Sequence, residues 1–358
     1  MLHPQLNHQI SSPAKHISWN DSLGAWEVRS YAEVLAILKD NRFSAAGVNI
    51  KDQNINLPDI DSNPREDQAE VIQALQQELP WIREKMQQIV LTTCLNRSYS
   101  NIIDFYDELI LPCCQQLALE LTDSTIRDEE KEELLEHAQS VFLMNSSENP
   151  DKALEATTSL STYFLDKIVH ARSSPKADYI SVLAQTKAAP TILLSPIIQL
   201  FTGVATSLPL LLSNVLLALL THPEEKEKYI KNPSQSINEL LRYAGPSQLV
   251  YRIALQDVEV GTMAFKKGER LALCLANANL DATQFVCPHQ LNSDRNAATH
   301  LSLGKGLHAC LGAPIIRAAL TIIPATILNH FPEIKIATDK VVWGGSSTIR
   351  GVISLPKN

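Results

Sequence analysis

One cysteine late in the sequence is flanked by glycines at a spacing that would suit a metal ligand. Cys310 lies in the segment HLSLGKGLHACLGAP, with Gly304 and Gly306 before it and Gly312 after it. Glycines permit tight turns and let a flat ligand approach the backbone closely. A helix is predicted to start just after Cys310, and the positive end of its dipole favours a thiolate, which is a strong donor ligand for iron. On spacing alone, a buried structural cysteine beside a glycine turn stays an alternative.

The other five cysteines show no spacing that is typical of a metal site or of a disulfide framework. They are Cys94, Cys113, Cys114, Cys274 and Cys287. They contain no CxxC pair and no disulfide-framework spacing, so reduced thiols in a cytoplasmic protein are the simpler interpretation. The N-terminal sequence lacks the basic and then apolar layout of a secretory signal. The formal net charge of -8 argues against nucleic acid as a partner.

The elements that must position Cys310 are mostly helices. Apolar residues at helical spacing predict helices over residues 31–40, 81–95, 101–122, 127–143, 158–173, 223–232, 236–244 and 312–331. Alternating patterns predict strands over residues 25–30, 257–261 and 269–277. Residues 45–80 are predicted to be a polar, irregular loop with short helical pieces, and residues 281–300 a coil. The sequence therefore predicts a mainly α, helix-rich single domain of residues 1–358 with small β-sheets.

The stretch from Ala188 to Pro223 contains no Asp, Glu, Lys or Arg and is long enough to cross a bilayer. Polar residues and prolines are nevertheless spread along it, among them Pro196, Ser213 and Asn214. A helix that is apolar all round is also typical of the centre of a large soluble core. We interpret the stretch as a buried central helix and expect no membrane span.

Two motifs together resemble the cytochrome P450 family. That family's cysteine loop is Phe-Gly-x-Gly-x-His/Arg-x-Cys-x-Gly, and the matching residues are Leu303, Gly304, Gly306, His308, Cys310 and Gly312. Upstream, Glu239 and Arg242 form the family's Glu-x-x-Arg pair, an ion pair on one helix face. The resemblance extends from about Pro13 to Pro356 and weakens over residues 45–80. It implies the cytochrome P450 fold, with haem b between the central helix and the cysteine loop, and Cys310 as the axial iron ligand.

The resemblance also assigns the haem surroundings. Buried propionates need cationic partners, and the matching positions are Arg252, His308 and Lys85, the last in a pattern with Trp81. His300 is a further candidate, with an ordinary surface histidine as the alternative. Lys85 stands where the family usually has arginine, and lysine cannot form the bidentate fork. Arg295 is the candidate for the third member of the Glu239–Arg242 brace.

The oxygen-binding side departs from the family's pattern. The central-helix motif Ala/Gly-Gly-x-Asp/Glu-Thr-Thr/Ser keeps Gly203 and Thr206, but the acid is replaced by Ala205. Splitting dioxygen requires proton delivery, and Ala205 cannot pass a proton, whereas Thr206 can donate a hydrogen bond to the bound oxygen. Pro209 should loosen the helix hydrogen bonds and admit water as a substitute. Leu303 replaces the ring that normally covers the thiolate.

Three functions are compatible with these residues. The first is a haem-thiolate monooxygenase that inserts one atom of dioxygen into a small, largely apolar substrate, with electrons from an external ferredoxin or flavodoxin and its reductase. The second is a peroxide-driven, rearranging or dehydrating haem-thiolate enzyme, which needs no proton relay. The third is a haem-binding relative without catalysis. By resemblance, substrate contacts should come from residues 45–80 and from Phe201, Val204, Gln248, Leu249, Val250, Thr348 and Ile349. A role in secondary metabolism is an expectation from the bacterial resemblance.

Overall fold

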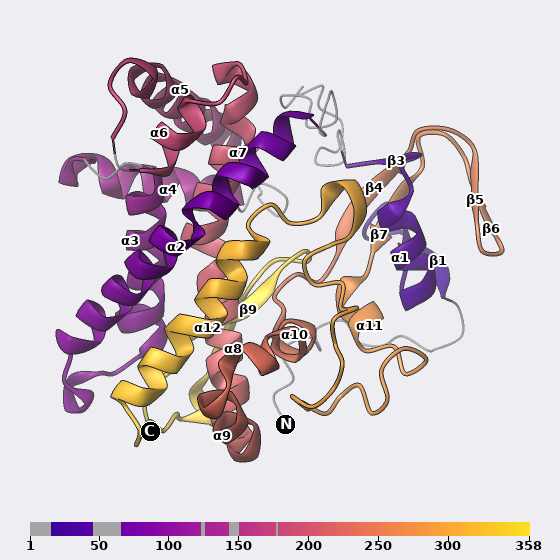
Figure 1. The fold of residues 1–358 in the computed structure, drawn as a ribbon. Coiled ribbons are helices and arrows are strands. Elements are labelled where there is room, and N and C mark those ends of the chain that lie inside the picture. Colours follow the sequence, from indigo (N-terminus) through magenta and orange to yellow (C-terminus); the bar gives the residue numbers. More distant parts are fainter. Residues whose placement is uncertain (1–15, 46–65, 123–125, 143–149, 177) are drawn as a thin grey trace. The chain divides into compact units, whose positions relative to one another are not determined.

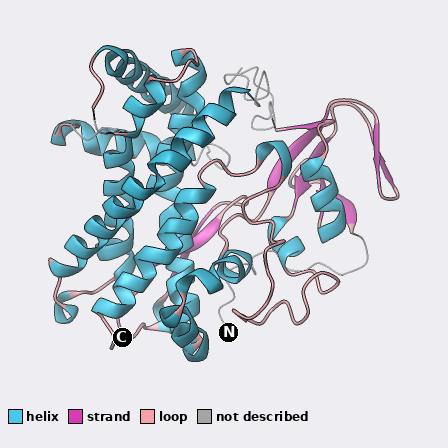
Figure 2. Ribbon diagram, in the orientation of Figure 1, coloured by secondary structure: helices cyan, strands magenta, loops and turns pink. Residues whose placement is uncertain are grey.

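The computed structural model describes residues 16–45, 66–122, 126–142, 150–176 and 178–358. The chain divides into two compact units. We call the unit formed by Met1–Pro64, Thr221–Cys310 and Gly345–Gly351 the sheet unit, and the unit formed by Arg65–Leu220, Leu311–Gly344 and Val352–Asn358 the helical unit. Figures 1 and 2 show that helices dominate and strands are few, which confirms the predicted mainly α class. A single domain over residues 1–358 stays a prediction.

The sheet unit is built on a five-stranded sheet with the strand order β1-β2-β7-β4-β3. These strands are β1 (Ile17–Asn20), β2 (Ala25–Val28), β3 (Phe43–Ser44), β4 (Val250–Ala254) and β7 (Arg270–Leu273). The β2–β7 pair is parallel, and the other pairs are antiparallel. A separate hairpin joins β5 (Val258–Val260) to β6 (Met263–Phe265). The sheet thus brings residues near the N-terminus beside strands from residues 250–273.

The helices of the sheet unit are α1 (Tyr31–Lys39), α9 (Pro223–Lys231), α10 (Pro233–Ala244), α11 (Leu275–Asn279) and the 3₁₀ turn η5 (Gly306–His308). The start of α1 is fixed by two side chains. Ser30 caps the helix by accepting from the backbone N–H of Glu33 at 3.4 Å, and Asp281 accepts from the N–H of Tyr31 at 2.9 Å. Val34 and Ile37 of α1 are fully buried in the main core of this unit.

The helical unit contains the longer helices. They are α2 (Glu66–Leu95), the π turn η2 (Tyr106–Ile110), α3 (Leu111–Thr122), α4 (Asp128–Phe142), α5 (Pro150–Ser173), α6 (Tyr179–Ala184) and α12 (Ala313–His330), with short 3₁₀ turns η1 (Tyr99–Asn101) and η6 (Thr338–Lys340). α12 lies along α2, as Figure 1 shows. The residues of the two-stranded sheet β8 (Val342–Gly345) and β9 (Arg350–Ser354) are divided between the two units.

The prediction of irregular structure over residues 45–80 was wrong from Glu66 onward, because α2 begins there. Pro80 lies inside α2. Val71, Leu75 and Ile82 are buried on one face, at spacings of four and seven residues. This apolar stripe continues through the proline, so packing outweighs the one hydrogen bond that proline removes. Residues 46–65 lie outside the described part of the chain.

The apolar stretch forms a continuous helical segment in three parts, α7 (Pro190–Thr202), the π turn η4 (Gly203–Ser207) and α8 (Leu208–Thr221). Among the described residues it is the helix long and apolar enough to cross a membrane, and 83% of its most apolar window is buried inside the protein. Its polar residues have internal partners. Ser213 donates to the carbonyl oxygen of Val352 at 2.7 Å, and Asn214 accepts from the N–H of Val352 at 2.9 Å. These contacts favour the predicted core helix.

The middle of this helix is loosened where Pro209 predicts it. The N–H of Leu208 donates to the carbonyl oxygen of Gly203, five residues earlier, which is the π pattern. Proline has no N–H, so Pro209 cannot donate to the carbonyl of Ala205 four residues before it. The chain therefore widens between Gly203 and Ser207, at the predicted catalytic positions.

Candidate functional site

The loop before Cys310 is closed by its own backbone. The N–H of Cys310 donates to the carbonyl oxygen of Leu303 at 2.8 Å, and the N–H of Ala309 donates to that of Gly306 at 3.2 Å. Gly304 and Gly306 adopt φ values of 66° and 75°, which side chains strongly disfavour. The glycines thus allow the chain to turn back on itself, so that Cys310 sits at the end of a closed loop. α12 begins at Ala313, three residues later, with Gly312 as its N-cap.

The same loop is fitted against the end of α1. A Cβ atom at Gly306 would lie 2.4 Å from the carbonyl oxygen of Leu38 and 3.1 Å from the Cα of Lys39. Both neighbours are backbone atoms, so they cannot move aside as a flexible side chain would. Two independent reasons therefore favour glycine at position 306: its positive φ value and the close contact with the backbone of α1.

Cys310 differs from the buried cysteines in its surroundings. Cys94, Cys113, Cys114 and Cys274 are buried, whereas Cys310 is half-buried. Burial raises the pKa of Cys94 to about 12 and that of Cys113 to about 11, so both stay protonated thiols at neutral pH. Among the described residues, no cluster of three or more His, Cys, Asp or Glu could hold a metal ion. A metal at Cys310 would therefore take most of its donor atoms from a cofactor.

The predicted cationic residues of the sheet unit are placed in several elements. Arg252 on β4 is buried, with 5% of its surface exposed, and its guanidinium donates to the carbonyl oxygen of Tyr251 at 2.7 Å. His300 is buried at 2% exposure, just before the cysteine loop. His308 ends η5 inside that loop and is half-buried. Their role toward propionates stays a prediction.

The Glu239–Arg242–Arg295 contacts are present as predicted. Arg242 donates to both carboxylate oxygens of Glu239, at 2.7 and 2.8 Å, and Arg295 donates to Glu239 at 3.2 Å. Glu239 and Arg242 are fully buried. Arg242 also donates to the backbone carbonyls of Asn279, Pro288 and Gln290, and Arg295 donates to those of Val286, Cys287 and Gln290. The ion cluster thus satisfies backbone carbonyls of a coil that has no regular structure to satisfy them.

A second link was missed by the sequence analysis. The side chain of Asn279 donates to the hydroxyl of Ser302 at 2.8 Å and accepts from the N–H of Leu301 at 2.7 Å. Ser302 in turn donates to the carbonyl oxygen of Leu241 at 2.6 Å. This chain of bonds ties the entry to the cysteine loop to α10. Asn and Ser residues in a coil form no sequence motif that predicts a partner. Only the three-dimensional contacts therefore reveal the link between Asn279 and Ser302.

The predicted oxygen-side residues lie together on η4 in the helical unit. Ala205 and Thr206 are buried, with 3% and 6% of their surfaces exposed. The hydroxyl of Thr206 donates to the carbonyl oxygen of Thr202 at 2.6 Å. Its proton is therefore engaged, while the lone pairs of its oxygen stay available to accept a hydrogen bond. Gly203 supplies the carbonyl that defines the π turn.

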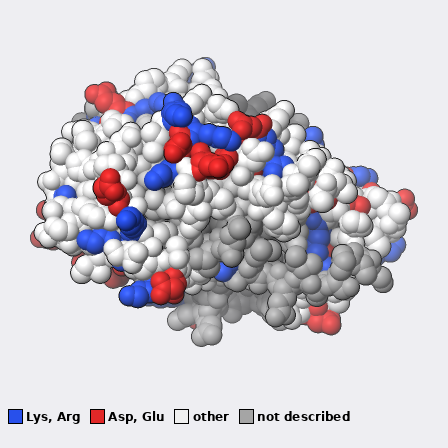
Figure 3. Space-filling view, turned by 90° about the horizontal axis from the view of Figure 1, so that it is seen from below, with Lys and Arg blue, Asp and Glu red and all other residues white. Residues whose placement is uncertain are grey.

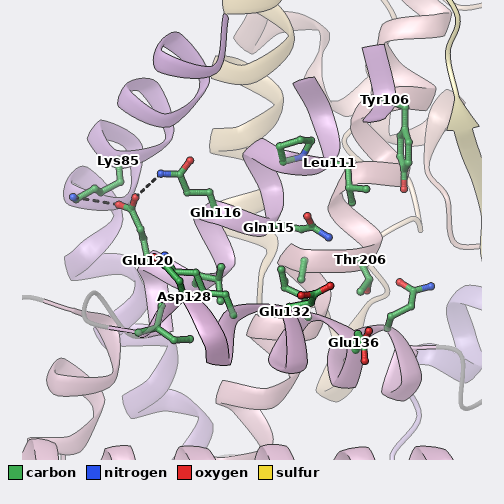
Figure 4. A pocket seen from close by; sticks show the side chains of 17 residues that line it. Lys85, Tyr106, Leu111, Gln115, Gln116, Glu120, Asp128, Glu132, Glu136 and Thr206 are labelled. Carbon is green, nitrogen blue, oxygen red and sulfur yellow. Dashed lines mark hydrogen bonds and ion pairs between the residues drawn. The ribbon is translucent and has the colours of Figure 1, made fainter. Parts of the chain in front are cut away.

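Lys85 has an ion-pair partner within the helical unit. Its ammonium group lies 3.3 Å from a carboxylate oxygen of Glu120 on α3, and Gln116 donates to the same carboxylate at 3.0 Å (Figure 4). Lys85 is already neutralised within the helical unit, so a propionate would have to compete with Glu120. Trp81 lies one turn earlier on α2 and is half-buried. Lys85 thus joins α2 to α3 by an ion pair, and its role toward a propionate stays a prediction.

The predicted substrate residues of the sheet unit converge from two segments. The backbone N–H groups of Gln248 and Leu249 donate to the carbonyl oxygen of Thr348, at 2.8 and 3.4 Å. Ile349 forms a bridge with Ser247, and Val250 begins β4. In the helical unit, Phe201 packs edge-to-face against Phe164 with ring centroids 5.4 Å apart, and Val204 is buried. Their contact with a substrate stays a prediction.

Comparisons with known proteins identify the fold that carries these loops. The sequence profile of the family described as "Cytochrome P450" matches residues 233–342, which contain the Glu239–Arg242 pair and the cysteine loop. The solved structure of the Bacillus subtilis 168 bacillaene polyketide synthase cytochrome P450 PksS has a TM-score of 0.82 at 27% identity, covering 93% of this chain and 90% of that one. The chain is similar to cytochromes P450 in both sequence and fold. The predicted cytochrome P450 fold is thereby confirmed.

Curated cytochromes P450 give the same result over parts of the chain. The cytochrome P450 CYP107DY1 of Priestia megaterium is 37% identical over 204 residues, 54% of this chain and 50% of that protein. The 6-deoxyerythronolide B hydroxylase of Saccharopolyspora erythraea is 26% identical over 289 residues, 77% of this chain and 70% of that protein. The chain thus matches about half the length of the first of these relatives.

The residues of the sheet unit fit the haem b that this cytochrome P450 family uses. A porphyrin supplies four nitrogen donors, so its iron needs from the protein only one strong ligand, and the half-buried Cys310 at the end of a closed loop suits that role. Buried Arg252 and His300 offer groups that can be cationic, as buried propionates require.

The contact between the cysteine loop and α1 makes a prediction for Gly306→Ala. Gly24→Ala is its matched control, because Gly24 has a φ of 56° and a Cβ added there would meet no atom within 4 Å. Both variants should lose about 1–2 kcal/mol to the disfavoured conformation. Only Gly306→Ala should lose more, together with its thiolate-type absorption band after reduction under carbon monoxide. Denaturant unfolding and that spectrum check it, and equal losses in the two variants would contradict the contact.

The buried ion cluster predicts a large effect of Arg242→Ala. The substitution leaves Glu239 buried without its main partner and should lower the free energy of unfolding by about 3–5 kcal/mol. Arg127→Ala, which removes an exposed arginine of the pair Arg127–Glu130, should change stability little. Urea unfolding of both variants tests this. A loss for Arg242→Ala no larger than that of the control would show that the cluster does not hold the coil.

Proposed function

We propose that this protein is a haem-thiolate monooxygenase. The observation that carries the proposal is the closed glycine loop that presents Cys310 half-buried at its end. Bound haem b would supply the iron at which dioxygen is reduced. The overall reaction consumes dioxygen, two electrons and two protons, inserts one oxygen atom into a C–H bond and releases the other as water.

Each of several residues has its own role in the proposed reaction. Cys310 would hold the haem iron, and the backbone bond from its N–H to Leu303 closes the loop that presents the sulfur. Arg252, His300, His308 and Lys85 would neutralise the propionates. Thr206 accepts a hydrogen bond at the oxygen-binding face and donates one after releasing the carbonyl of Thr202. Leu303 leaves the sulfur less covered than an aromatic ring would.

The partners follow from the reaction and the family. Because the chain matches cytochromes P450 named for polyketide biosynthesis and for hydroxylation of 6-deoxyerythronolide B, we infer a small, largely apolar substrate of secondary metabolism. Electrons would come from an external ferredoxin or flavodoxin and its reductase, in the cytoplasm. On the face shown in Figure 3, coloured Lys and Arg side chains are interspersed with Asp and Glu. That mixture and the net charge of -8 support the absence of a nucleic-acid partner.

A second candidate is favoured by Ala205, the position of the family's acid. A peroxide-driven or rearranging haem-thiolate enzyme needs no proton relay. Product formation without NAD(P)H and a reductase would favour this candidate. Strict dependence on both the reductase and dioxygen would favour the monooxygenase and also exclude a relative that only binds haem.

The iron ligand is tested by the carbon monoxide difference spectrum of the reduced protein. The natural protein should give a thiolate-type band, and Cys310→Ser should abolish it, because a serine hydroxyl is not an equivalent donor. Cys287→Ser, at an exposed cysteine outside the loop, should keep the band. An unaltered haem spectrum in Cys310→Ser would overturn the proposed function.

The role of Thr206 is tested by electron coupling. Thr206→Ala should release more reduced oxygen as peroxide and lower the product formed per NAD(P)H by about 100-fold, the lower end of what a positioned proton-transfer group contributes. Ser207→Ala is the matched control, since the Ser207 hydroxyl donates in the same way to the carbonyl of Gly203 at 2.8 Å. Equal coupling in Thr206→Ala and the natural protein, measured with one verified substrate, would remove Thr206 from the mechanism.

A further inference from the structure

We propose that an acidic cavity between α3 and α4 carries protons to Thr206, and that Glu132 and Glu136 of α4 replace the acid missing at Ala205. This inference rests on the proposed function and names the proton donors that the reaction needs. It is carried by the shape and charge of one cavity in the helical unit.

The cavity has a volume of about 1070 Å³ and is open to solvent. It is lined by α3, α4, η4 and single residues of α2 and η2 (Figure 4). At η4 its lining residues are Ala205 and Thr206. A side chain longer than alanine at position 205 would therefore extend toward this space.

The cavity-facing side of α4 is a polar stripe. Asp128, Glu132, Glu136 and Gln139 line the cavity at spacings of three and four residues, which places them on one face of the helix. Figure 4 shows the side chains of Glu132 and Glu136 at the same part of the cavity as Thr206. A stripe of this kind differs from the apolar face that a helix usually turns toward its neighbours.

The charges of the cavity are not balanced. Its lining contains the carboxylates of Glu120, Asp128, Glu132 and Glu136 and the ammonium groups of Lys85 and Lys131. Glu120 pairs with Lys85, and Asp128 pairs with Lys131. Glu132 and Glu136 have no ion-pair partner among the described residues and are exposed. Both are therefore placed to exchange protons with bulk water and to draw cations, including protons, into the cavity.

The inner end of the cavity is suited to receive those protons. Thr206 is buried except toward this space, and its hydroxyl oxygen keeps acceptor capacity because its own proton goes to Thr202. The π turn widens the helix at this point, and the methyl group of Ala205 leaves room for water. Functional sites often use such π turns.

The proton balance is simple. For each substrate oxidised, two protons leave the carboxyl groups of Glu132 or Glu136 and pass through cavity water to Thr206 and then to the oxygen being reduced. Each carboxylate then takes a proton from bulk water. The two electrons come from the ferredoxin or flavodoxin of the proposed function, so the cavity itself is neither oxidised nor reduced.

The first experiment tests the cavity without any turnover. Ala205→Cys in a Cys287→Ser background is treated with a cationic and an anionic methanethiosulfonate reagent, and mass spectrometry measures the labelling rate at position 205. The cationic reagent should react at least about threefold faster, because the cavity attracts positive charge. With Glu132→Gln and Glu136→Gln added, the two rates should become nearly equal. Gln115→Cys, at a lining residue on α3, repeats the measurement at a second position.

Two labelling results would overturn the inference. One is an introduced thiol that reacts only after the protein is unfolded, which would mean that water does not reach Ala205. The other is the same ratio of cationic to anionic rates with and without the two glutamates.

The second experiment measures proton delivery in the haem-loaded protein. NADPH, a plant ferredoxin and its reductase supply electrons, and dioxygen consumption is followed in H₂O and D₂O. The double variant Glu132→Gln with Glu136→Gln should consume dioxygen about 100-fold more slowly, with a larger solvent isotope effect. Glu129→Gln, at an exposed α4 residue outside the cavity lining, should match the natural protein. Adding Ala205→Glu to the double variant should restore part of the rate.

The outcomes separate the two proposals. If the natural protein consumes dioxygen and the double variant equals Glu129→Gln, the relay is wrong and the monooxygenase stands. The alternative outcome is that the natural protein shows a thiolate-type spectrum but consumes no dioxygen. In that case both the proposed monooxygenase function and the proton relay are wrong, whatever the labelling result.

Discussion

The sheet unit depends on one buried ion cluster. Residues 281–300 and the cysteine loop have almost no regular hydrogen bonding, so their backbone carbonyls need donors from elsewhere. Arg242 and Arg295 provide those donors, and Glu239 neutralises both. Two guanidinium groups offer many directed N–H groups from a small volume. The desolvation of these charges is costly, yet no apolar substitute would hold an irregular coil in one conformation.

The cysteine loop then adds constraints of a different kind. Its closure is backbone to backbone, from Cys310 to Leu303, and its position against Leu38 depends on the absence of a side chain at Gly306. The ligand position is thus defined by the main chain rather than by side-chain packing. Replacement of the family's aromatic residue by Leu303 is compatible with this arrangement, because the contact that closes the loop uses the Leu303 carbonyl.

The features that sequence predicted well are those encoded by local spacing. The i,i+3 pair Glu239–Arg242, the glycines around Cys310 and the disturbance caused by Pro209 all act within one turn or one loop, and each has the predicted geometry. Lys85 shows the opposite case, because its partner Glu120 comes from another helix.

Tertiary contacts also explain what sequence did not predict. The helix through Pro80 exists because its buried stripe packs on other helices, and the Asn279–Ser302 link joins residues 23 positions apart. Glu132 and Glu136 look like an ordinary solvated helix face in the sequence. Only the opposite walls from α3 and η4 turn that face into the lining of a cavity.

The bonds of Ser213 and Asn214 to Val352 have a consequence for the order in which the chain is made. On the ribosome, the apolar helix emerges well over one hundred residues before β9, since Ser213 and Val352 are 139 positions apart. Until Val352 is synthesised, Ser213 and Asn214 lack these two long-range bonds, and the segment has the composition of a membrane helix. The apolar helix therefore reaches its native hydrogen bonding only after β9 has been synthesised, more than one hundred residues later.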